Sequence, residues 1–273
     1  MTPSIMTAEQ KTALAGFLDT AGDCLGDGYR RPRENYAFTD DAAGVSHPEQ
    51  GAAAAAGGLS AEGGSPAASA AAAISSGGTL EEIAAEVHAC HACPLGAGRT
   101  HAVPGEGVKN PLVLVIGEGP GQDEDRTGRP FVGRAGQLLD KMLAAIDLRR
   151  QENCFIANVV KCRPPENRDP APEEAQACRP FLNRQIACLR PRMILCVGKV
   201  AANLLLGNEE WAAIGSLRSR FFEYPAEPPI PLLATYHPSA QLRNENLKRP
   251  AWEDLKLLRS RLEEPAPGSL KNT

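Results

Sequence analysis

The sequence predicts an α/β fold: a three-layer sandwich around a central, mostly parallel four-stranded sheet. Short apolar runs that are typical of buried strands recur along residues 79–264. Helical patterns alternate with these runs, as the connections between parallel strands require. Residues 1–78 show little such patterning, so we expect a largely disordered N-terminal region ahead of a single folded domain.

The N-terminal region has two parts. Residues 7–22 favour one short amphipathic helix. Residues 51–78 are rich in Ala, Gly and Ser with almost no large apolar side chains, a composition typical of a linker. The helix is either a dispensable tail or a docking element for an unidentified protein partner. We therefore divide the chain into residues 1–78, a domain at 79–264 and a tail at 265–273.

The domain begins with a helix. Thr79 and Glu82 fit a capping box, and the helix leads into Cys90. Pro180 marks a break or an offset start in a later helical segment. The apolar runs predict strands at 111–117, 155–160, 192–198 and 231–239, and the helical patterns lie at 134–148, 173–189, 199–207 and 250–262.

Composition narrows the class of protein. The formal net charge is −4, yet residues 81–264 are neutral, so the acidity belongs to the N-terminal part and does not exclude a nucleic-acid partner. No apolar run approaches the length of a membrane span, and the start of the chain lacks a secretory signal pattern. Eight cysteines are too few for a disulfide scaffold. We expect a cytoplasmic monomer in a reducing compartment.

Four cysteines are spaced for metal binding. Cys90 and Cys93 form a CxxC pair, and Cys162 and Cys178 flank a Pro-rich loop and the helix after it. Together they can complete a four-sulfur site for zinc or for an iron–sulfur cluster, and thiolate ligation alone does not separate the two. The alternative is a set of unrelated buried thiols, which better suits the other cysteines: Cys154, Cys188 and Cys196, with Cys24 a free thiol in the linker.

Candidate site residues follow the strands. Because ligands of open α/β sheets bind at the carboxyl ends of the strands, the loops after Ile116, Val160 and Tyr236 should share one edge. The GEGPG loop at 117–121 lacks the spacing of nucleotide-binding fingerprints. It leaves one carboxylate, Glu118, on a tight glycine turn, and a solvated turn is the simpler alternative.

Three further side chains stand out in these loops. Asn158 interrupts the apolar strand FIANVV, and its amide matches the donor and acceptor edge of a base unless the neighbouring backbone satisfies it. His237 precedes Pro238, which keeps it out of helical geometry, and a capping or core histidine is the alternative. Phe131, in a Gly-rich loop, either stacks on a ligand ring or packs beneath the loop.

These segments resemble a known family. GEGPGQDEDRTGRPFVGRAGQLL, NVVKCRPPENRDP with Cys178 downstream, and HPSAQLR look like the iron–sulfur uracil-DNA glycosylases called family 4. The resemblance covers about residues 80–262. It implies a 4Fe–4S cluster on the four cysteines of the CxxC and Pro-rich segments. It also implies a uracil pocket built from Gly117, Glu118, Gly119, Phe131, Asn158 and His237.

The resemblance further implies a reaction. Such an enzyme hydrolyses the N-glycosidic bond of deoxyuridine in DNA, releases uracil and leaves an abasic site, the first step of base excision repair. Glu118 would orient or activate the attacking water, and His237 would stabilise the departing uracil. Phe131 would stack on the extruded base, Asn158 would pair with it, and Glu124 is a candidate wall against the methyl group of thymine.

Residues after the histidine are candidates for DNA contacts. Ser239 and Arg243 would hold the DNA backbone, and Gln241 or Leu242 would wedge into the base stack. Two other functions remain open at this point. An iron–sulfur or zinc module that binds nucleic acid without catalysis would also explain the cysteines, as would an iron–sulfur electron carrier. The electron carrier would not need an Asn within a strand or an HPS loop facing GEGPG, and metal analysis separates a zinc module from an iron–sulfur protein.

Overall fold

A computed structural model describes residues 78–208 and 210–264 of the protein. The helix predicted at 7–22, nearly all of the predicted N-terminal region and the tail at 265–273 lie outside the described residues. Among the described residues, no helix is long and apolar enough to cross a membrane.

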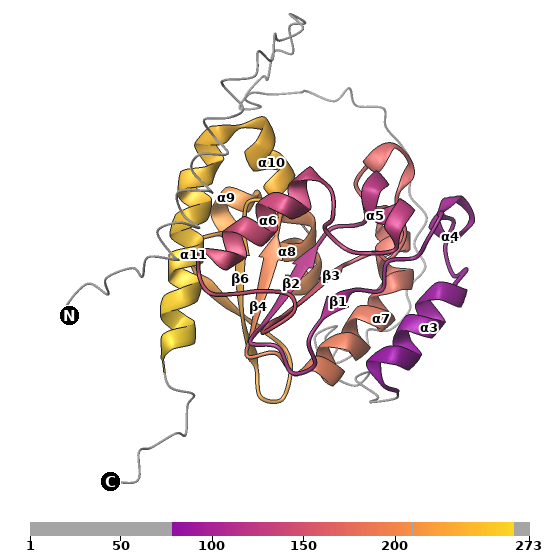
Figure 1. The fold of residues 1–273 in the computed structure, drawn as a ribbon, viewed down its shortest axis with the longest axis horizontal. Coiled ribbons are helices and arrows are strands. Elements are labelled where there is room, and N and C mark those ends of the chain that lie inside the picture. The colour runs from indigo at the N-terminus through magenta and orange to yellow at the C-terminus, as the bar shows by residue number, and fades with distance from the viewer. Residues whose placement is uncertain (1–77, 209, 265–273) are drawn as a thin grey trace, which may run out of the picture.

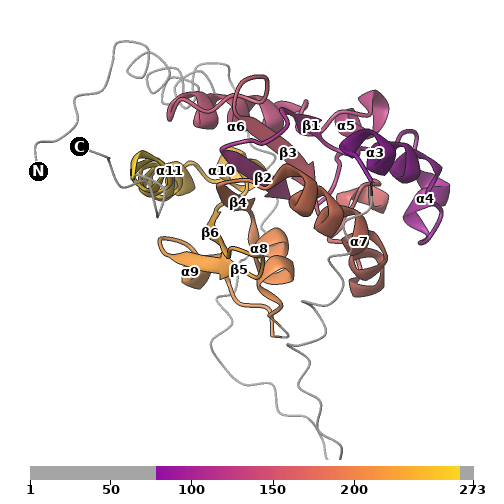
Figure 2. The same cartoon turned by 90° about the horizontal axis from the view of Figure 1, so that it is seen from below.

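The structure is built on one six-stranded, mostly parallel sheet in the order β1-β3-β2-β4-β6-β5 (Figure 1, with β5 labelled in Figure 2). Its central strands β3, β2, β4 and β6 are parallel to one another. They correspond to the four predicted strands. The strands are β1 (Glu106–Gly107), β2 (Val113–Gly117), β3 (Cys154–Asn158), β4 (Met193–Val197), β5 (Phe221–Tyr224) and β6 (Ile230–Thr235).

The prediction of four strands is wrong because the sheet has an additional antiparallel strand at each edge. β1 is only two residues long and contains no apolar side chain, so it leaves no pattern in the sequence. β5 lies at the opposite edge, where three of its four residues are half-buried or exposed. Edge strands of this kind lack the continuous apolar run that marked the central strands.

Helices cover both faces of the sheet (Figure 2). The predicted segments are all helical, and short helices join them. The helices are α3 (Leu80–Ala89), α4 (Leu95–Gly98), α5 (Gln122–Thr127), α6 (Arg134–Ala144), α7 (Pro172–Leu189), α8 (Lys199–Leu206), α9 (Ile214–Leu217), α10 (Pro238–Arg243) and α11 (Lys248–Glu263), with the 3-10 turns η1 (Pro165–Asn167) and η2 (Glu245–Leu247).

Alternate residues of each central strand enter two separate cores. Leu114 and Ile116 of β2 pack with residues of α7 and α8 on one face. Val113 and Val115 of the same strand pack with α6 and α11 on the other face. Both faces are therefore buried, which explains why these strands consist of continuous apolar runs.

Two local predictions concern helix ends. The capping box is confirmed, because Glu82 accepts a hydrogen bond from the Thr79 amide at 2.7 Å and the Thr79 hydroxyl accepts one from the Glu82 amide at 3.2 Å. The break predicted at Pro180 is wrong, because α7 runs without interruption from Pro172 to Leu189. Pro180 is exposed, so its ring costs the helix one backbone hydrogen bond without disturbing the core.

The strand ends bring distant loops to one edge of the sheet. Gly117 at the end of β2 is in register with Asn158 at the end of β3. The two loops continue together, since the amides of Val159 and Val160 donate to the carbonyls of Gly117 and Glu118 at 2.9 and 3.1 Å. β6 ends at Thr235, so the fourth predicted strand was too long at its C-terminal end.

Candidate active site

Three of the predicted residues meet at Gly117. A Cβ atom at this position would lie 2.5 Å from the Asn158 side-chain oxygen and 2.5 Å from the Phe131 ring. Both distances are shorter than any real contact, so only glycine allows this approach. Asn158 and Phe131 are buried, with 1% and 6% of their surfaces exposed. The loop before α6 and the ends of β2 and β3 therefore form one compact unit.

Asn158 is held by its backbone, while its side chain keeps a free acceptor. Its carbonyl accepts a hydrogen bond from the ammonium of Lys161 at 2.9 Å. Its side-chain oxygen Oδ1 is buried and has no hydrogen-bond partner among the described residues. Because an unpaired buried acceptor costs about 1–3 kcal/mol, this atom is suited to a ligand that supplies an N–H donor.

His237 faces the same unit from the end of β6. Its ring lies 5.7 Å from the Phe131 ring, centroid to centroid, with 36° between the ring planes. The residue is the N-cap of α10, with an extended backbone ahead of Pro238, as predicted. Its Nδ1 accepts from the Ser239 amide at 3.1 Å and lies 2.7 Å from the Ser239 hydroxyl.

These contacts define the tautomer of the neutral imidazole, that is, which ring nitrogen carries the proton. Since a backbone N–H can only donate, Nδ1 is an acceptor and the proton of the neutral ring lies on Nε2. Burial, assisted by the positive charge of Arg243, lowers the pKa of His237 to about 4. The ring is therefore neutral at physiological pH and presents one N–H donor.

Glu118 follows β2 and is half-buried. Burial and the nearby carboxylate of Asp169 raise the pKa of Glu118 to about 7, while the Lys199 ammonium lowers it. Asp169 and Lys199 are themselves paired at 3.3 Å. The Glu118 carboxyl can thus change protonation state near neutral pH, as a general base requires.

Sequence reasoning missed Asp169 and Lys199. Asp169 lies in the Pro-rich loop that was considered for its cysteine, and Lys199 is the first residue of α8, two positions after β4 ends. β4 is parallel to β2 and β6, so its carboxyl end lies at the same edge. The strand-end rule also indicates Lys199, since it follows the carboxyl end of β4.

The remaining predicted residues have mixed outcomes. A Cβ at Gly119 would lie 2.8 Å from the Val160 side chain, so this glycine permits the close approach of the two loops. Ser239 contacts His237, and Arg243 is exposed at the end of α10. Gln241 cannot be a wedge, because its side chain is fully buried and donates to the Tyr236 carbonyl at 3.0 Å.

Two other residues considered from the sequence have defined surroundings. Leu242 is partly buried and packs against the core beneath α6 and α11. Glu124 accepts hydrogen bonds from the amides of Gly121, Val132 and Gly133 at 3.0, 2.8 and 2.9 Å. The role of Glu124 as a wall stays a prediction, and its observed contacts brace the loop that carries Phe131.

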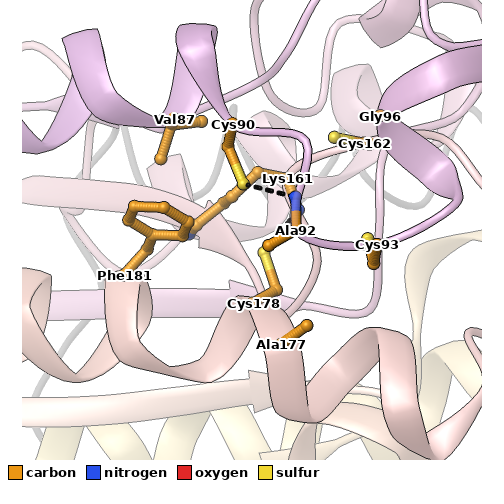
Figure 3. A pocket seen from close by; sticks show the side chains of 10 residues that line it. All are labelled: Val87, Cys90, Ala92, Cys93, Gly96, Lys161, Cys162, Ala177, Cys178 and Phe181. Atoms are coloured by element: carbon orange, nitrogen blue, oxygen red, sulfur yellow. Dashed lines mark hydrogen bonds between the residues drawn. The ribbon is translucent and has the colours of Figure 1, made fainter.

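The four predicted ligand cysteines line one pocket between α3, α4 and α7 (Figure 3). Three of these sulfurs accept hydrogen bonds from N–H donors: Cys90 accepts from the Ala92 amide at 3.5 Å. Cys162 accepts from the Arg99 guanidinium at 3.1 Å, and Cys178 accepts from the Lys161 amide at 3.3 Å. Within the described parts of the chain, no group of three or more His, Cys, Asp or Glu side chains is arranged to hold a single metal ion.

Burial and a nearby cation act on the Cys178 thiol in opposite directions. Burial raises the pKa of the Cys178 thiol to about 11, but the Lys161 ammonium opposes this shift. Lys161 is itself fully buried, and burial lowers its pKa to about 8. The Lys161 ammonium is a buried positive charge that acts on Cys178 of this four-sulfur pocket, and such a charge suits a centre that carries net negative charge.

The other described cysteines do not join this pocket. Cys154 lies in β3 and Cys196 in β4, and both are buried in the cores. Cys188 donates to the Gly78 carbonyl at 3.1 Å. Their separate positions match the prediction that they are individual thiols, whereas Cys24 lies outside the described residues.

Comparisons with a family model and with individual proteins point to the same family. The model of the "Uracil DNA glycosylase superfamily" matches residues 104–256. A "Type-4 uracil-DNA glycosylase" of Sulfurisphaera tokodaii is 42% identical over 184 residues, which cover 66% of this chain and 84% of that protein. Proteins of the same name from Archaeoglobus fulgidus and Thermotoga maritima are each 41% identical, over 65% and 66% of this chain and 90% and 93% of their own lengths.

Proposed function

Because this chain belongs to the uracil DNA glycosylase superfamily and acts as a uracil-DNA glycosylase in DNA repair, we propose a role for each site residue in the release of uracil. The reaction hydrolyses the N-glycosyl bond of deoxyuridine in DNA. The observation that carries the proposal is the meeting of Asn158, Phe131 and His237 at one edge of the sheet.

The first step is extrusion of the nucleotide from the DNA helix. Flipping costs a few kcal/mol, and the cost is smallest for a mispaired base. We propose that the Phe131 ring stacks on the extruded uracil, which recovers about 1–3 kcal/mol. Its loop is closely packed, so little order has to be gained when the base arrives.

Asn158 selects the base by hydrogen bonding. Its unpaired Oδ1 accepts from the uracil N3–H, and its amide nitrogen donates to O4. Cytosine presents the reverse pattern, an acceptor at N3 and a donor at N4. Such a bidentate contact is worth about 1–3 kcal/mol of discrimination.

His237 stabilises the leaving group. As the glycosidic bond breaks, negative charge develops on uracil and positive charge on the sugar. The neutral imidazole donates its Nε2–H to the uracil O2, while Ser239 fixes the other ring nitrogen. By comparison with oxyanion-hole donors, removing this contact costs about 3–4 kcal/mol, or about 10²–10³ in rate.

Glu118 acts on the attacking water. As a carboxylate it orients or deprotonates the water and faces the positive sugar. A pKa of about 7 suits either role, because the group is substantially ionised at neutral pH and remains a competent base.

Two residues of α10 are proposed to contact the DNA backbone: Ser239 and Arg243, which is exposed.

The four cysteines Cys90, Cys93, Cys162 and Cys178 are proposed to hold a 4Fe–4S cluster. The donor set fits, because four cysteine sulfurs line one pocket and the buried Lys161 also lines it. A cluster bound there supplies a rigid cross-link, and hydrolysis requires no redox step from it. Lys161 extends this cross-link to the site, since its amide contacts Cys178 and its ammonium contacts the Asn158 carbonyl and the Gln185 side chain.

All proposed site residues come from one chain, so we propose that the enzyme works as a monomer on uracil-containing DNA. The test incubates the protein with an oligonucleotide that contains one uracil and then cleaves abasic sites with alkali. Glu118→Ala and His237→Ala should each lose most strand scission, whereas Glu152→Ala, an exposed carboxylate paired with Arg149, should retain it. Scission that survives both site substitutions would overturn the assigned chemistry.

A further inference from the structure

Phe131 adopts a backbone conformation that large residues rarely tolerate. Its φ angle is +53°, in the left-handed region where a bulky side chain is unfavourable. Residues in such conformations persist only where their surroundings hold them, and they cluster at functional sites. The contacts around Phe131 therefore show what the protein uses to keep the ring in place.

The first of these contacts comes from Arg150. Its guanidinium donates to the carbonyls of Pro130 and Phe131, each at 2.9 Å. Arg150 is 5% exposed and is anchored in turn by the Asp140 carboxylate at 2.8 Å. Because the guanidinium is planar and rigid, it fixes both carbonyls in one orientation.

The second contact comes from Glu124, on the other side of the same loop. Its Oε1 accepts from the amides of Val132 and Gly133, the two residues that follow Phe131. Its Oε2 accepts from Gly121 at the start of α5. The Glu124 carboxylate thus joins the Phe131 loop to the start of α5. Arg150, which follows α6 in the chain, joins the same loop to Asp140 of α6.

Helix α6 leaves the loop no space to relax. A Cβ at Gly136 would lie 2.0 Å from the carbonyl carbon and oxygen of Phe131. The Phe131 backbone therefore rests directly on α6, with its carbonyl and the following amides already bonded. The ring projects from this support toward Gly117 and His237.

We propose that Glu124 and Arg150 are positioning residues that hold the Phe131 ring ready to receive the base, and that they determine the affinity of the site for uracil. The inference rests on the proposed stacking role of Phe131. A ring fixed before binding loses little freedom when the base stacks on it, and that saving appears as tighter binding.

The test measures two affinities for each variant: inhibition of excision by free uracil, and binding to DNA that contains an abasic site. Phe131→Ala and Glu124→Ala should each raise the inhibition constant of uracil about tenfold, the size expected for one lost stacking contact. Arg150→Lys should raise it as well, because an ammonium cannot bond two carbonyls and a carboxylate in one plane. Affinity for abasic DNA should remain at the wild-type value, since no base occupies the pocket.

Two further variants separate positioning from general stability. Glu82→Ala removes the same kind of capping contact from α3 without touching the site, and should leave both affinities unchanged. Glu124→Gln should fall between wild type and Glu124→Ala, because its carbonyl can keep the Val132 and Gly133 amides while its NH₂ cannot accept from Gly121. If Glu124 acts through Phe131, adding Glu124→Ala to Phe131→Ala should produce no further loss of uracil affinity.

The outcomes distinguish the two hypotheses. If Phe131→Ala weakens uracil binding but Glu124→Ala, Glu124→Gln and Arg150→Lys do not, the positioning role is wrong and the stacking role stands. If Phe131→Ala itself has no effect on uracil binding, the stacking role is wrong, and the positioning role that rests on it is wrong as well. Equal losses for uracil and abasic DNA, or full additivity in the double variant, would show that Glu124 supports the fold rather than the ring.

Discussion

Two charged side chains act on the Glu118 carboxyl in opposite directions. Burial and Asp169 raise its pKa to about 7, while Lys199 lowers it. If the carboxylate is the active form, excision should increase as pH rises through about 7. His237, whose pKa lies near 4, should add no second inflection above pH 5. Single-turnover excision between pH 5 and 9 measures this profile.

Substitution of the two neighbours should move that profile in opposite senses. Asp169→Asn removes a negative charge, so it should lower the pKa of Glu118 and shift the rise to lower pH. Lys199→Gln removes a positive charge and should shift the rise to higher pH. Glu253→Ala, on the distant helix α11, is the control. A rise that stays in place in both variants would mean that another group controls the reaction.

The residues found from sequence differ in kind from those that were missed. Asn158, Phe131 and His237 are each anomalous in their own segment: a polar residue in a strand, an aromatic in a glycine loop, a histidine before a proline. Asp169 and Lys199 are ordinary surface charges in sequence terms. They matter only because two loops bring them together beside Glu118, and local patterns do not report such pairings.

At the scale of elements, the four-cysteine pocket joins α3 and α4 to the loop after β3. Cys162→Ser should lower the iron content and the yield of folded protein together, because a missing ligand loosens that junction. Cys154→Ala, a buried thiol in β3 outside the pocket, should keep its iron. Absorbance of the purified protein and iron analysis measure both. A cluster-free variant with full excision activity would refute the bracing role.

One buried carboxylate of helix α11 forms hydrogen bonds to β6 and to the segment before β5. Asp254 is fully buried and accepts from Arg218 at 2.9 and 3.0 Å, from Ser219 at 3.1 Å and from Thr235 at 2.8 Å. Asp254→Ala leaves the arginine charge without its partner, so the free energy of unfolding should fall by about 3–5 kcal/mol.

Urea denaturation measures this loss. Glu253→Ala is the matched control, because Glu253 is an exposed neighbour on the same helix whose ion pair with Lys256 should contribute only about 0–1 kcal/mol. A comparable small loss for both variants would show that the buried network contributes little net stability.

The elements that sequence could predict are those buried on both faces or long enough to show a helical period. The four central strands and the five long helices belong to this group. β1, β5 and the short helices do not, because an edge strand or a single turn has no periodic apolar face. The break predicted at Pro180 is wrong because a proline on the exposed side of a well-packed helix is tolerated.

At the scale of the whole molecule, residues 78–208 and 210–264 contain both cores, the four-cysteine pocket and the candidate site. We therefore predict that a protein comprising residues 78–264 folds alone, binds iron and excises uracil at the full-length rate. Circular dichroism, iron analysis and the alkali cleavage assay check these properties. Loss of excision in a folded, iron-containing truncation would assign residues 1–77 or 265–273 a part in the reaction.

The order of the strands also matters while the chain is still being synthesised. β6 lies inside the sheet between β4 and β5, yet it is the last of the described strands to leave the ribosome, and His237 follows it. Translation that stops early yields a fragment whose β4 has an unpaired edge, which promotes aggregation and removal by proteases. Such a fragment also lacks His237, so under the proposed mechanism an unfinished polypeptide should release uracil at least about 10²–10³-fold more slowly than the finished protein.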